Sequence, residues 1–379
     1  MNAYSIVVLP GDGIGPEVID EAVRALKVVQ SSGLCQFDLD TIPCAGSYYI
    51  EHQREWPEGS LERCKASDAI LLGAIGHLDA SGKPVRRADG ELAGYEQVIG
   101  LRMKLDLYMN MRPIQLFPGV LHSISGSYKQ VWDAHNINLV VLRENTEGAY
   151  TPGAFMLERK DQVETVISPT IITRRGARRV VRRAFELANR REGAPSDGRA
   201  RVTCVDKSNV VRAHRLFRNM FREIALEYPN IEPDFAYVDA FCHSLVREPE
   251  RYDVVVAPNL PGDIITDLGS VLQGGMGMAA SGNVGDEHAM FEPIHGSAPD
   301  ITGKRIANPV AAILSVSLML KWLGQTRKDP EATRAGEAIE ESIRQTLVTG
   351  EYFPADLGGS TKTDELGSEI CNRLQELLA

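Results

Sequence analysis

The chain reads VVVAPNLPGDIITD over residues 254–267, an apolar run that leads directly into a segment with two acids. Val254–Ala257 has the length and β-branched content of a buried strand, and helical spacing follows it. Asp263 and Asp267 stand four residues apart, so a helix that opens at Asp263 places both carboxylates on one face. Such a pair of hard oxygen donors suits Mg²⁺ or Mn²⁺. The alternative is an ordinary acidic first turn, which the helix dipole stabilises.

The same succession of strand and helix recurs along the chain. Short β-branched runs predict buried strands at Ile6–Leu9, Ala69–Ile75, Leu139–Leu142, Val202–Val205 and Val254–Ala257. A helical pattern follows the first of them from Pro16 to Val29 and meets a stop signal at Ser31-Ser32-Gly33. The sequence therefore predicts an α/β fold in which helices cover a sheet. Polar residues follow the strand ends, where open α/β sheets form their sites.

The size and charge of the chain exclude one class of function. The 379 residues suffice for two domains or one two-lobed unit. The net charge of −10 argues against nucleic acid as a partner, because phosphate binding needs a basic surface. The arginine-dense segment 174–191 has apolar residues at helical spacing, which predicts an amphipathic helix with a solvated basic face.

The cysteines and apolar runs indicate the compartment. Six cysteines show neither a Cys-x-x-Cys pair nor metal-finger spacing, and reduced thiols fit a cytoplasmic protein. The N-terminus lacks a signal-peptide pattern. The longest apolar run, Val310–Leu320, is far shorter than the ~20 residues of a membrane-spanning helix. We therefore expect a cytoplasmic protein with no membrane partner.

A glycine-rich turn follows the first expected strand. Residues 11–17 read GDGIGPE between that strand and its helix. The third glycine falls one position early for the Rossmann pattern, and a ribose-binding acid is lacking about 20 residues further on. We interpret the segment as a tight turn beside a ligand cleft.

Several basic and acid–base side chains stand near the ends of the expected elements. Arg102, Arg112 and Arg143 would hold a di- or tricarboxylate if their guanidinium groups converge, whereas each one alone is more often in an ordinary ion pair. Tyr150 and Lys207 can act as general acid or base where their surroundings favour proton transfer near neutral pH. A lone tyrosine or lysine is usually structural or solvated.

A specialised loop lies near the C-terminal third. Residues 292–301 read EPIHGSAPDI, and the prolines and small residues suit the close approach of a nucleotide to the backbone. Asp300 can accept hydrogen bonds from ribose hydroxyls and repels a 2′-phosphate, so the loop favours NAD over NADP. A purely structural loop is the alternative.

Together these motifs resemble those of the β-decarboxylating dehydrogenases, the family of the isopropylmalate, isocitrate, homoisocitrate and tartrate/D-malate dehydrogenases. The resemblance runs from residues 11–17 to Ile306-Ala307-Asn308-Pro309. It implies a two-lobed α/β fold with a large mixed sheet flanked by helices. Residues 1–107 and 275–379 are expected to form the large cofactor-binding lobe. Residues 108–274 are expected to form the smaller lobe, with the dimer interface and the metal and catalytic residues.

The resemblance also implies a role for each group. Arg102, Arg112 and Arg143 match the arginines that bind substrate carboxylates, Tyr150 matches the catalytic acid, and Lys207 the catalytic base. The expected ligands of Mg²⁺ or Mn²⁺ are Asp239, Asp263 and Asp267. The expected NAD-binding residues are Glu292, His295, Gly296, Ser297, Ala298, Pro299, Asp300, Ile301 and Asn308. In the family, the matching lysine and one aspartate reach into the partner subunit, so Lys207 and Asp239 imply a homodimer with shared active sites.

The implied reaction is an NAD- and metal-dependent oxidative β-decarboxylation of a 2R-hydroxy acid. Lys207 accepts the proton of the C2 hydroxyl, which a bound metal acidifies. Hydride passes from C2 to the nicotinamide. Loss of CO₂ then leaves an enolate, which Tyr150 protonates at C3.

The C3 substituent of the substrate depends on the segment before Arg102. At the positions where the family reads this substituent, the chain has Tyr95, Val98 and Ile99. Two aliphatic residues favour a small or apolar group, because an unpaired carboxylate against them is costly. A 3-isopropylmalate-like substrate is therefore favoured. Asn145-Thr146-Glu147-Gly148 instead resembles the isocitrate, homoisocitrate and tartrate branches. The cations of the 77–93 loop (Lys83, Arg86 and Arg87) either meet an acidic substituent or face water.

Several alternatives stay open. They are a homoisocitrate or isocitrate dehydrogenase, a tartrate/D-malate dehydrogenase, a secondary-metabolic dehydrogenase of another 3-substituted malate such as a phosphonate, and a non-catalytic regulatory subunit. Regulatory subunits usually lose an arginine, the tyrosine or an aspartate, all of which this chain retains. An ordinary Rossmann 2-hydroxyacid dehydrogenase has no need for the aspartate pair.

Overall fold

The computed structural model describes residues 2–151, 153–159 and 162–379. The chain divides into two compact units. Unit 1 contains Met1–Leu107, Gln115–Ala134 and Ser270–Ala379, and unit 2 contains Tyr108–Ile114 and His135–Gly269. Both chain ends therefore belong to unit 1, and most of the middle of the chain forms unit 2.

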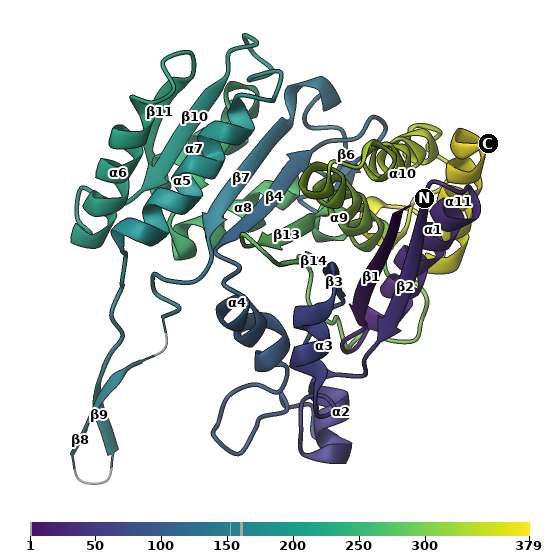
Figure 1. The fold of residues 1–379 in the computed structure, drawn as a ribbon, viewed down its shortest axis with the longest axis horizontal. Coiled ribbons are helices and arrows are strands. Elements are labelled where there is room, and N and C mark those ends of the chain that lie inside the picture. The colour runs from purple at the N-terminus through teal and green to yellow at the C-terminus, as the bar shows by residue number, and fades with distance from the viewer. Residues whose placement is uncertain (1, 152, 160–161) are drawn as a thin grey trace. The chain divides into compact units, whose positions relative to one another are not determined.

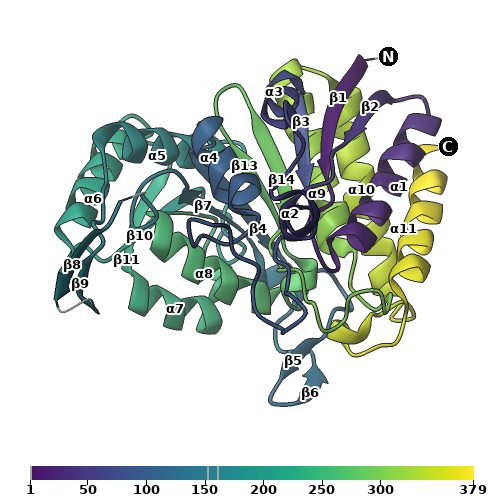
Figure 2. The same ribbon diagram turned by 90° about the horizontal axis from the view of Figure 1, so that it is seen from below.

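Unit 1 contributes five strands in the order β13-β14-β3-β1-β2. Their bounds are β1 Asn2–Leu9, β2 Cys35–Thr41, β3 Ala69–Leu72, β13 Ala280–Val284 and β14 Ala289–Pro293. The β13–β14 pair is antiparallel, whereas the other pairs in this order are parallel. Four long helices pack together beside these strands (Figure 2): α1 Gly15–Ser31, α9 Val310–Arg327, α10 Pro330–Val348 and α11 Thr363–Leu378.

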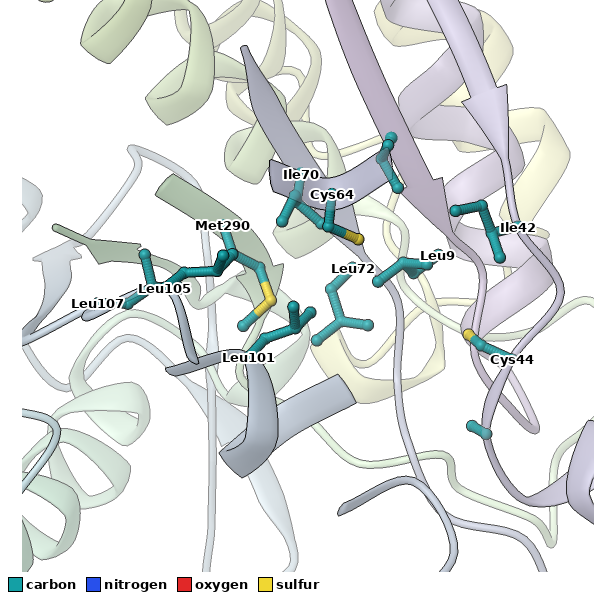
Figure 3. Close-up of a cluster of buried hydrophobic side chains, with 12 residues drawn as sticks. Leu9, Ile42, Cys44, Cys64, Ile70, Leu72, Leu101, Leu105, Leu107 and Met290 are labelled. Atoms are coloured by element: carbon teal, nitrogen blue, oxygen red, sulfur yellow. The ribbon is translucent and has the colours of Figure 1, made fainter. Parts of the chain in front are cut away.

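Shorter elements complete unit 1. They are α2 Ala45–His52, α3 Ser60–Ala66, the π-helix η1 Glu96–Gly100, which continues into α4 Leu101–Lys104, the hairpin of β5 His122–Ile124 and β6 Ser127–Lys129, and the 3₁₀ turns η4 Met276–Met278 and η5 Ala355–Leu357. A buried cluster joins several of them (Figure 3). Alternate residues of β1 and β3, such as Leu9 and Ile70, meet Met290 of β14 and Leu101 of α4 in this cluster. Strand side chains alternate between the two faces, so one face of the strands holds α4 in place.

Unit 2 contributes five strands in the order β11-β10-β12-β7-β4. Their bounds are β4 Met109–Gln115, β7 Asn138–Glu144, β10 Arg201–Asp206, β11 Glu232–Tyr237 and β12 Val254–Ala257. In Figure 2, α5 Arg174–Ala188 and α6 Arg212–Ala225 lie on one face of these strands, and α7 Val238–Arg247 and α8 Asn259–Leu272 lie on the other. The 3₁₀ turns η2 Ala134–Asn136 and η3 Pro249–Arg251 lie in the connections. A hairpin of β8 Phe155–Arg159 and β9 Gln162–Ile167 projects away from the body of unit 2 (Figure 1).

The predicted α/β fold with a large mixed sheet flanked by helices is confirmed. All five predicted strands are present, but β3 ends at Leu72 rather than Ile75. The neighbouring β1 ends at Leu9, and the next residue, Pro10, cannot donate a ladder hydrogen bond. Within the described parts of the chain, none of the helices combines the length and apolarity that crossing a bilayer demands.

Two helix predictions have different outcomes. The segment from Arg174 forms the amphipathic helix α5, whose apolar residues, Val180 and Ala184 among them, are buried. The acid pair lies within one helix as considered from the sequence, but that helix does not open at Asp263, because α8 begins at Asn259. Pro261 falls in the first turn, where the missing N–H costs nothing. Asp263 therefore lies beyond the first turn, and the helix dipole does not account for the acid pair.

Candidate functional site

Three side chains of unit 2 meet at the carboxylate of Asp263 on α8. Arg143, near the end of β7, donates from Nη1 to Oδ1 at 2.5 Å, and Arg112 of β4 donates from Nη2 to the same oxygen at 3.4 Å. The hydroxyl of Tyr150 donates to Oδ2 at 2.8 Å. The guanidinium carbon of Arg143 also lies 5.4 Å from the centre of the Tyr150 ring. Two cations and one phenol thus converge on one acid.

Both arginines are held rigidly beneath the surface of unit 2. Arg143 is 1% exposed, and its Nε and Nη2 donate to Oδ1 of Asn259 at 3.1 and 2.6 Å. Arg112 donates from Nε to Oδ1 of Asn110 at 2.7 Å and from Nη1 to Oγ1 of Thr266 at 2.6 Å. Because these contacts fix the guanidinium planes, the arginines are preorganised to bind a planar carboxylate. They are not solvated surface charges.

Asp267 supplies a second carboxylate on the same face of α8. Its Oδ1 accepts from Nη1 of Arg112 at 3.1 Å. The side chain of Asp267 is 51% exposed and that of Asp263 is 29% exposed, so each can present oxygen to a ligand. Hard oxygen donors of this kind fit Mg²⁺ or Mn²⁺, which retain positions for substrate. Across the described residues, Asp239 does not join them in a group of three metal-binding side chains.

Lys207 and Asp239 form a separate pair in unit 2. Nζ of Lys207, just after β10, lies 2.6 Å from Oδ1 of Asp239 in the first turn of α7. This hydrogen bond from Lys207 lowers the pKa of the Asp239 carboxyl. The backbone N–H of Lys207 donates to Nδ1 of His214 at 2.9 Å, and burial lowers the pKa of that imidazole. The buried Asp206 beside Lys207 accepts two hydrogen bonds from Arg218, at 2.8 and 2.9 Å. The local fold therefore fixes the backbone at Lys207.

Arg102 lies in unit 1 and contacts a residue of the predicted cofactor loop. Its Nη2 donates to Oε1 of Glu292 at 3.1 Å, and Nδ2 of Asn283 donates to the same oxygen at 2.7 Å. Arg102 is 7% exposed, and its Nε is buried with no hydrogen-bond partner among the described residues. A buried donor of this kind is costly unless a ligand satisfies it. Tyr95, Val98 and Ile99 are half-buried on the preceding turns.

The turn at residues 11–17 lies against the predicted cofactor loop. The N–H of Ile14 donates to the carbonyl of Ser297 at 2.9 Å. Gly13 has φ +58°, and a Cβ there would lie 2.1 Å from that carbonyl, so glycine is required. The buried Asp12 carboxylate accepts from the N–H groups of Gly46, Ser47 and Gly76 at 3.0, 2.8 and 3.1 Å. This is a tight turn at the predicted cofactor loop.

The remaining residues of the cofactor loop differ in their surroundings. Burial lowers the pKa of His295, and its Nε2 is buried with no partner within the described parts of the chain. Gly296, Pro299 and Asp300 are exposed, whereas Ala298 and Ile301 are half-buried. Asn308 is buried, and its Nδ2 donates to Oδ2 of Asp356 at 3.1 Å. The loop thus offers exposed backbone and a carboxylate, while Asn308 contacts the protein itself.

The sequence did not single out the residues that orient the two arginines. Asn110 precedes Arg112 by two residues on β4, and this strand period puts both on one face. Thr266 stands three residues after Asp263, a helical neighbour. Asn259 follows Val254–Ala257 by two residues, where polar residues are expected past a strand end. The spacings of Asn110 to Arg112 and of Thr266 to Asp263 are visible in the sequence. They indicate a shared face only where the bounds of the strand and the helix are known.

Comparisons with known proteins identify the family of the chain. The family model "Isocitrate/isopropylmalate dehydrogenase" matches residues 5–370. A homoisocitrate dehydrogenase of Methanocaldococcus jannaschii is 39% identical, with 98% of each chain covered. A 3-isopropylmalate dehydrogenase of Clavibacter michiganensis subsp. michiganensis is 41% identical, again with 98% of each covered. The crystal structure of isocitrate dehydrogenase from Methylococcus capsulatus superposes with a TM-score of 0.81 at 33% identity, covering 98% of this chain and 99% of that one.

These relatives carry the names of different substrates at nearly equal identity. The comparison therefore confirms the expected family and the expected enzyme class, but it does not select the substituent at C3. The chain belongs to the isocitrate/isopropylmalate dehydrogenase family and is a decarboxylating dehydrogenase.

Proposed function

We propose that the protein catalyses the NAD- and divalent-metal-dependent oxidative β-decarboxylation of a 3-substituted malate, with a 3-isopropylmalate-like substrate favoured. The convergence of Arg112, Arg143 and Tyr150 on Asp263 carries this proposal. Two buried cations beside an acid pair suit an anionic substrate that binds together with a metal ion. The aliphatic side chains of Val98 and Ile99 favour an apolar C3 group.

The residues of the site divide into anion binders and metal ligands. Arg102, Arg112 and Arg143 bind the substrate carboxylates. Asp263 and Asp267 hold Mg²⁺ or Mn²⁺ together with Asp239 from a second copy of the chain. When bound, the metal supplies a Lewis acid that makes the substrate hydroxyl more acidic.

Proton transfer falls to Lys207 and Tyr150. Lys207 accepts the hydroxyl proton, and its ammonium form is stabilised by a carboxylate such as Asp239, 2.6 Å away in this chain. Tyr150 gives its proton to C3 after CO₂ is lost. The contact of its hydroxyl with Asp263 at 2.8 Å orients the phenol toward the substrate position.

A homodimer with shared sites is part of the proposal. Lys207 and Asp239 pair with each other, and within the described residues Asp239 does not complete a group of three metal ligands with Asp263 and Asp267. Every described residue of the β8–β9 hairpin is exposed. Its large apolar side chains are 51–68% exposed, namely Phe155, Met156, Leu157, Val163, Val166 and Ile167. An isolated hairpin with an apolar surface needs a covering partner, and a second copy meets that need.

The remaining parts of the proposal concern the lobes, the cofactor and the compartment. Unit 1, which holds residues 115–134 and 270–274 in addition to the expected 1–107 and 275–379, is the cofactor-binding lobe, and unit 2 is the lobe with the metal, catalytic and interface residues. Asp300, exposed in the cofactor loop, supports NAD over NADP because it repels a 2′-phosphate. Free thiols at all six cysteines are consistent with a cytoplasmic location.

A substrate panel tests the proposed function. We would compare kcat/KM for 3-isopropylmalate, D-malate, tartrate, isocitrate, homoisocitrate and a phosphonate analogue, with NAD or NADP and with Mn²⁺ or Mg²⁺. The expected result is NADH formation that requires metal and is fastest with 3-isopropylmalate. Preference for a tricarboxylate would instead support homoisocitrate or isocitrate and contradict the role given to Val98 and Ile99. Activity that persists in a chelator would refute the metal-dependent mechanism.

A further inference from the structure

Glu55 is a buried carboxylate of unit 1 to which the proposed mechanism gives no role. It is 5% exposed. Its Oε1 accepts from the backbone N–H groups of Gly94 and Tyr95 at 2.7 and 3.1 Å, and its Oε2 accepts from that of Glu96 at 3.0 Å. The first N–H groups of a helix lack partners within the helix. Glu55 therefore caps the start of η1, and its negative charge lies at the positive end of the helix dipole.

Arg87 neutralises this buried acid. Its Nη1 lies 3.5 Å from Oε2 of Glu55 and 3.7 Å from Oε1 of Glu96, and its other nitrogens bind Asp89. The guanidinium also lies over the ring of Tyr95, with its carbon 5.4 Å from the ring centre. A buried carboxylate without such a counter-ion is costly, so the pair acts as a unit. Arg87 thus neither faces water alone nor stands free to meet an acidic substrate.

The element that Glu55 caps contains residues that are expected to contact the substrate. Val98 and Ile99 lie within η1, and Arg102 follows on α4. Leu101 and Leu105, four residues apart, anchor the same element in the buried cluster (Figure 3). A π-helix is a rare conformation that needs support from its surroundings. The apolar contacts support one side of the element, and Glu55 supports its beginning.

We propose that Glu55, with Arg87 as its counter-ion, is a positioning residue that sets the placement of Val98 and Ile99 against the C3 substituent. It does so through the backbone at residues 94–96 and touches no substrate atom. The charged 77–93 loop then contributes to substrate selection indirectly, because its Arg87 is the counter-ion that stabilises the buried Glu55 carboxylate. This inference rests on the proposed function.

Glu55→Gln tests the proposal, since it keeps the side-chain volume but removes the charge and one acceptor. The readout is the ratio of kcat/KM for 3-isopropylmalate to that for D-malate, which has no C3 substituent. We expect this ratio to fall about tenfold, which is the discrimination that apolar contact with a substituent typically provides. The fall should come mainly from a higher KM for 3-isopropylmalate. Turnover of D-malate should stay within about twofold of wild type. Glu55→Asp, which keeps the charge, should recover part of the ratio.

Two further variants separate positioning from stability. Glu58→Gln, three residues along and with an 88% exposed side chain, is the matched control and should leave the ratio unchanged. Arg87→Gln removes the counter-ion from a 20% exposed position and should lower the ratio even if Glu55→Gln folds poorly. In the two test variants, Glu55→Gln and Arg87→Gln, the backbone amides of residues 94–100 should exchange hydrogen faster than in the control Glu58→Gln.

The outcomes also separate the inference from the proposed function. An unchanged ratio in both test variants, or an equal loss for both substrates together with a lower melting temperature, overturns the positioning role and leaves the function standing. A wild-type enzyme that turns over no malate of the panel overturns the proposed function, and this inference with it. A reduced ratio with unchanged D-malate turnover supports both.

Discussion

Replacing Tyr150 by phenylalanine separates chemistry from stability, because the hydroxyl makes a contact that is worth little to the fold. It donates to Asp263 at 2.8 Å from a side chain that is 41% exposed. A hydrogen bond to a charged group contributes about 1.5–3 kcal/mol when buried, so at this exposure we expect less than ~1 kcal/mol. A general acid contributes about 10²–10⁴ in rate, or ~3–5 kcal/mol of barrier. Turnover should therefore fall at least about a hundredfold while the melting temperature barely moves.

Rapid mixing of Tyr150→Phe with substrate, NAD and Mn²⁺ provides the assay. If Tyr150 acts only after CO₂ is lost, NADH should appear in a burst of one equivalent per site, followed by slow turnover. Tyr128→Phe is the matched control, because Tyr128 is 43% exposed and donates one hydrogen bond, to the carbonyl of Ala355 at 2.9 Å. Wild-type turnover in Tyr150→Phe would refute the assignment. Loss of the burst would mean that Tyr150 acts in or before hydride transfer.

Three other predictions concern the acid pair, the cofactor loop and the histidine beside Lys207. Asp267→Asn should raise the Mn²⁺ concentration for half-maximal activity at least about tenfold without lowering the melting temperature, since the side chain is half exposed; a metal titration decides. Asp300→Lys should shift the ratio of kcat/KM toward NADP, because a cation attracts the 2′-phosphate. Burial lowers the pKa of His214 in the folded protein. Below about pH 6.5 the unfolded chain therefore binds a proton at this histidine more readily than the folded chain does. As the pH falls from that value, the free energy of unfolding should fall by up to ~1.4 kcal/mol per pH unit. Denaturant titrations at several pH values should show a weaker fall in His214→Asn than in wild type.

The strands and the amphipathic helix were predictable because their signals are local. Val254–Ala257 matches β12 residue for residue, since four apolar residues between turn signals have few other stable arrangements. The boundaries were less accurate where a neighbouring element decides them. The end of β3 depends on Pro10, which lies about sixty residues earlier in β1's connection. The start of α8 depends on whether Pro261 is a helix breaker or a first-turn residue, and periodicity does not distinguish the two.

The sequence named the side chains that meet at Asp263, but it did not name the residues that support them. The motifs named Arg112, Arg143 and Asp263, and in the structure both guanidinium groups lie within hydrogen-bonding distance of the Asp263 carboxylate. Glu55 had no such signal, because it caps backbone groups 39–41 residues away. A carboxylate that acts through another segment's N–H groups leaves no spacing to read. The sequence likewise left open whether the cations of the 77–93 loop meet an acidic substituent or face water, because Arg87 pairs with Glu55, which is distant in the sequence.

The charges around Asp263 restrict which substrates can use the site. Arg112 and Arg143 contribute two buried positive charges, and Asp263 and Asp267 balance them within the chain. A divalent cation that draws on the two carboxylates leaves the guanidinium groups without their partners, and in a partly buried site that repulsion is large. A substrate with two carboxylates would restore the balance by giving the arginines new partners. A monocarboxylic hydroxy acid leaves one positive charge uncompensated. Under the proposed function, the charges around Asp263 therefore favour a dicarboxylate over a monocarboxylic hydroxy acid.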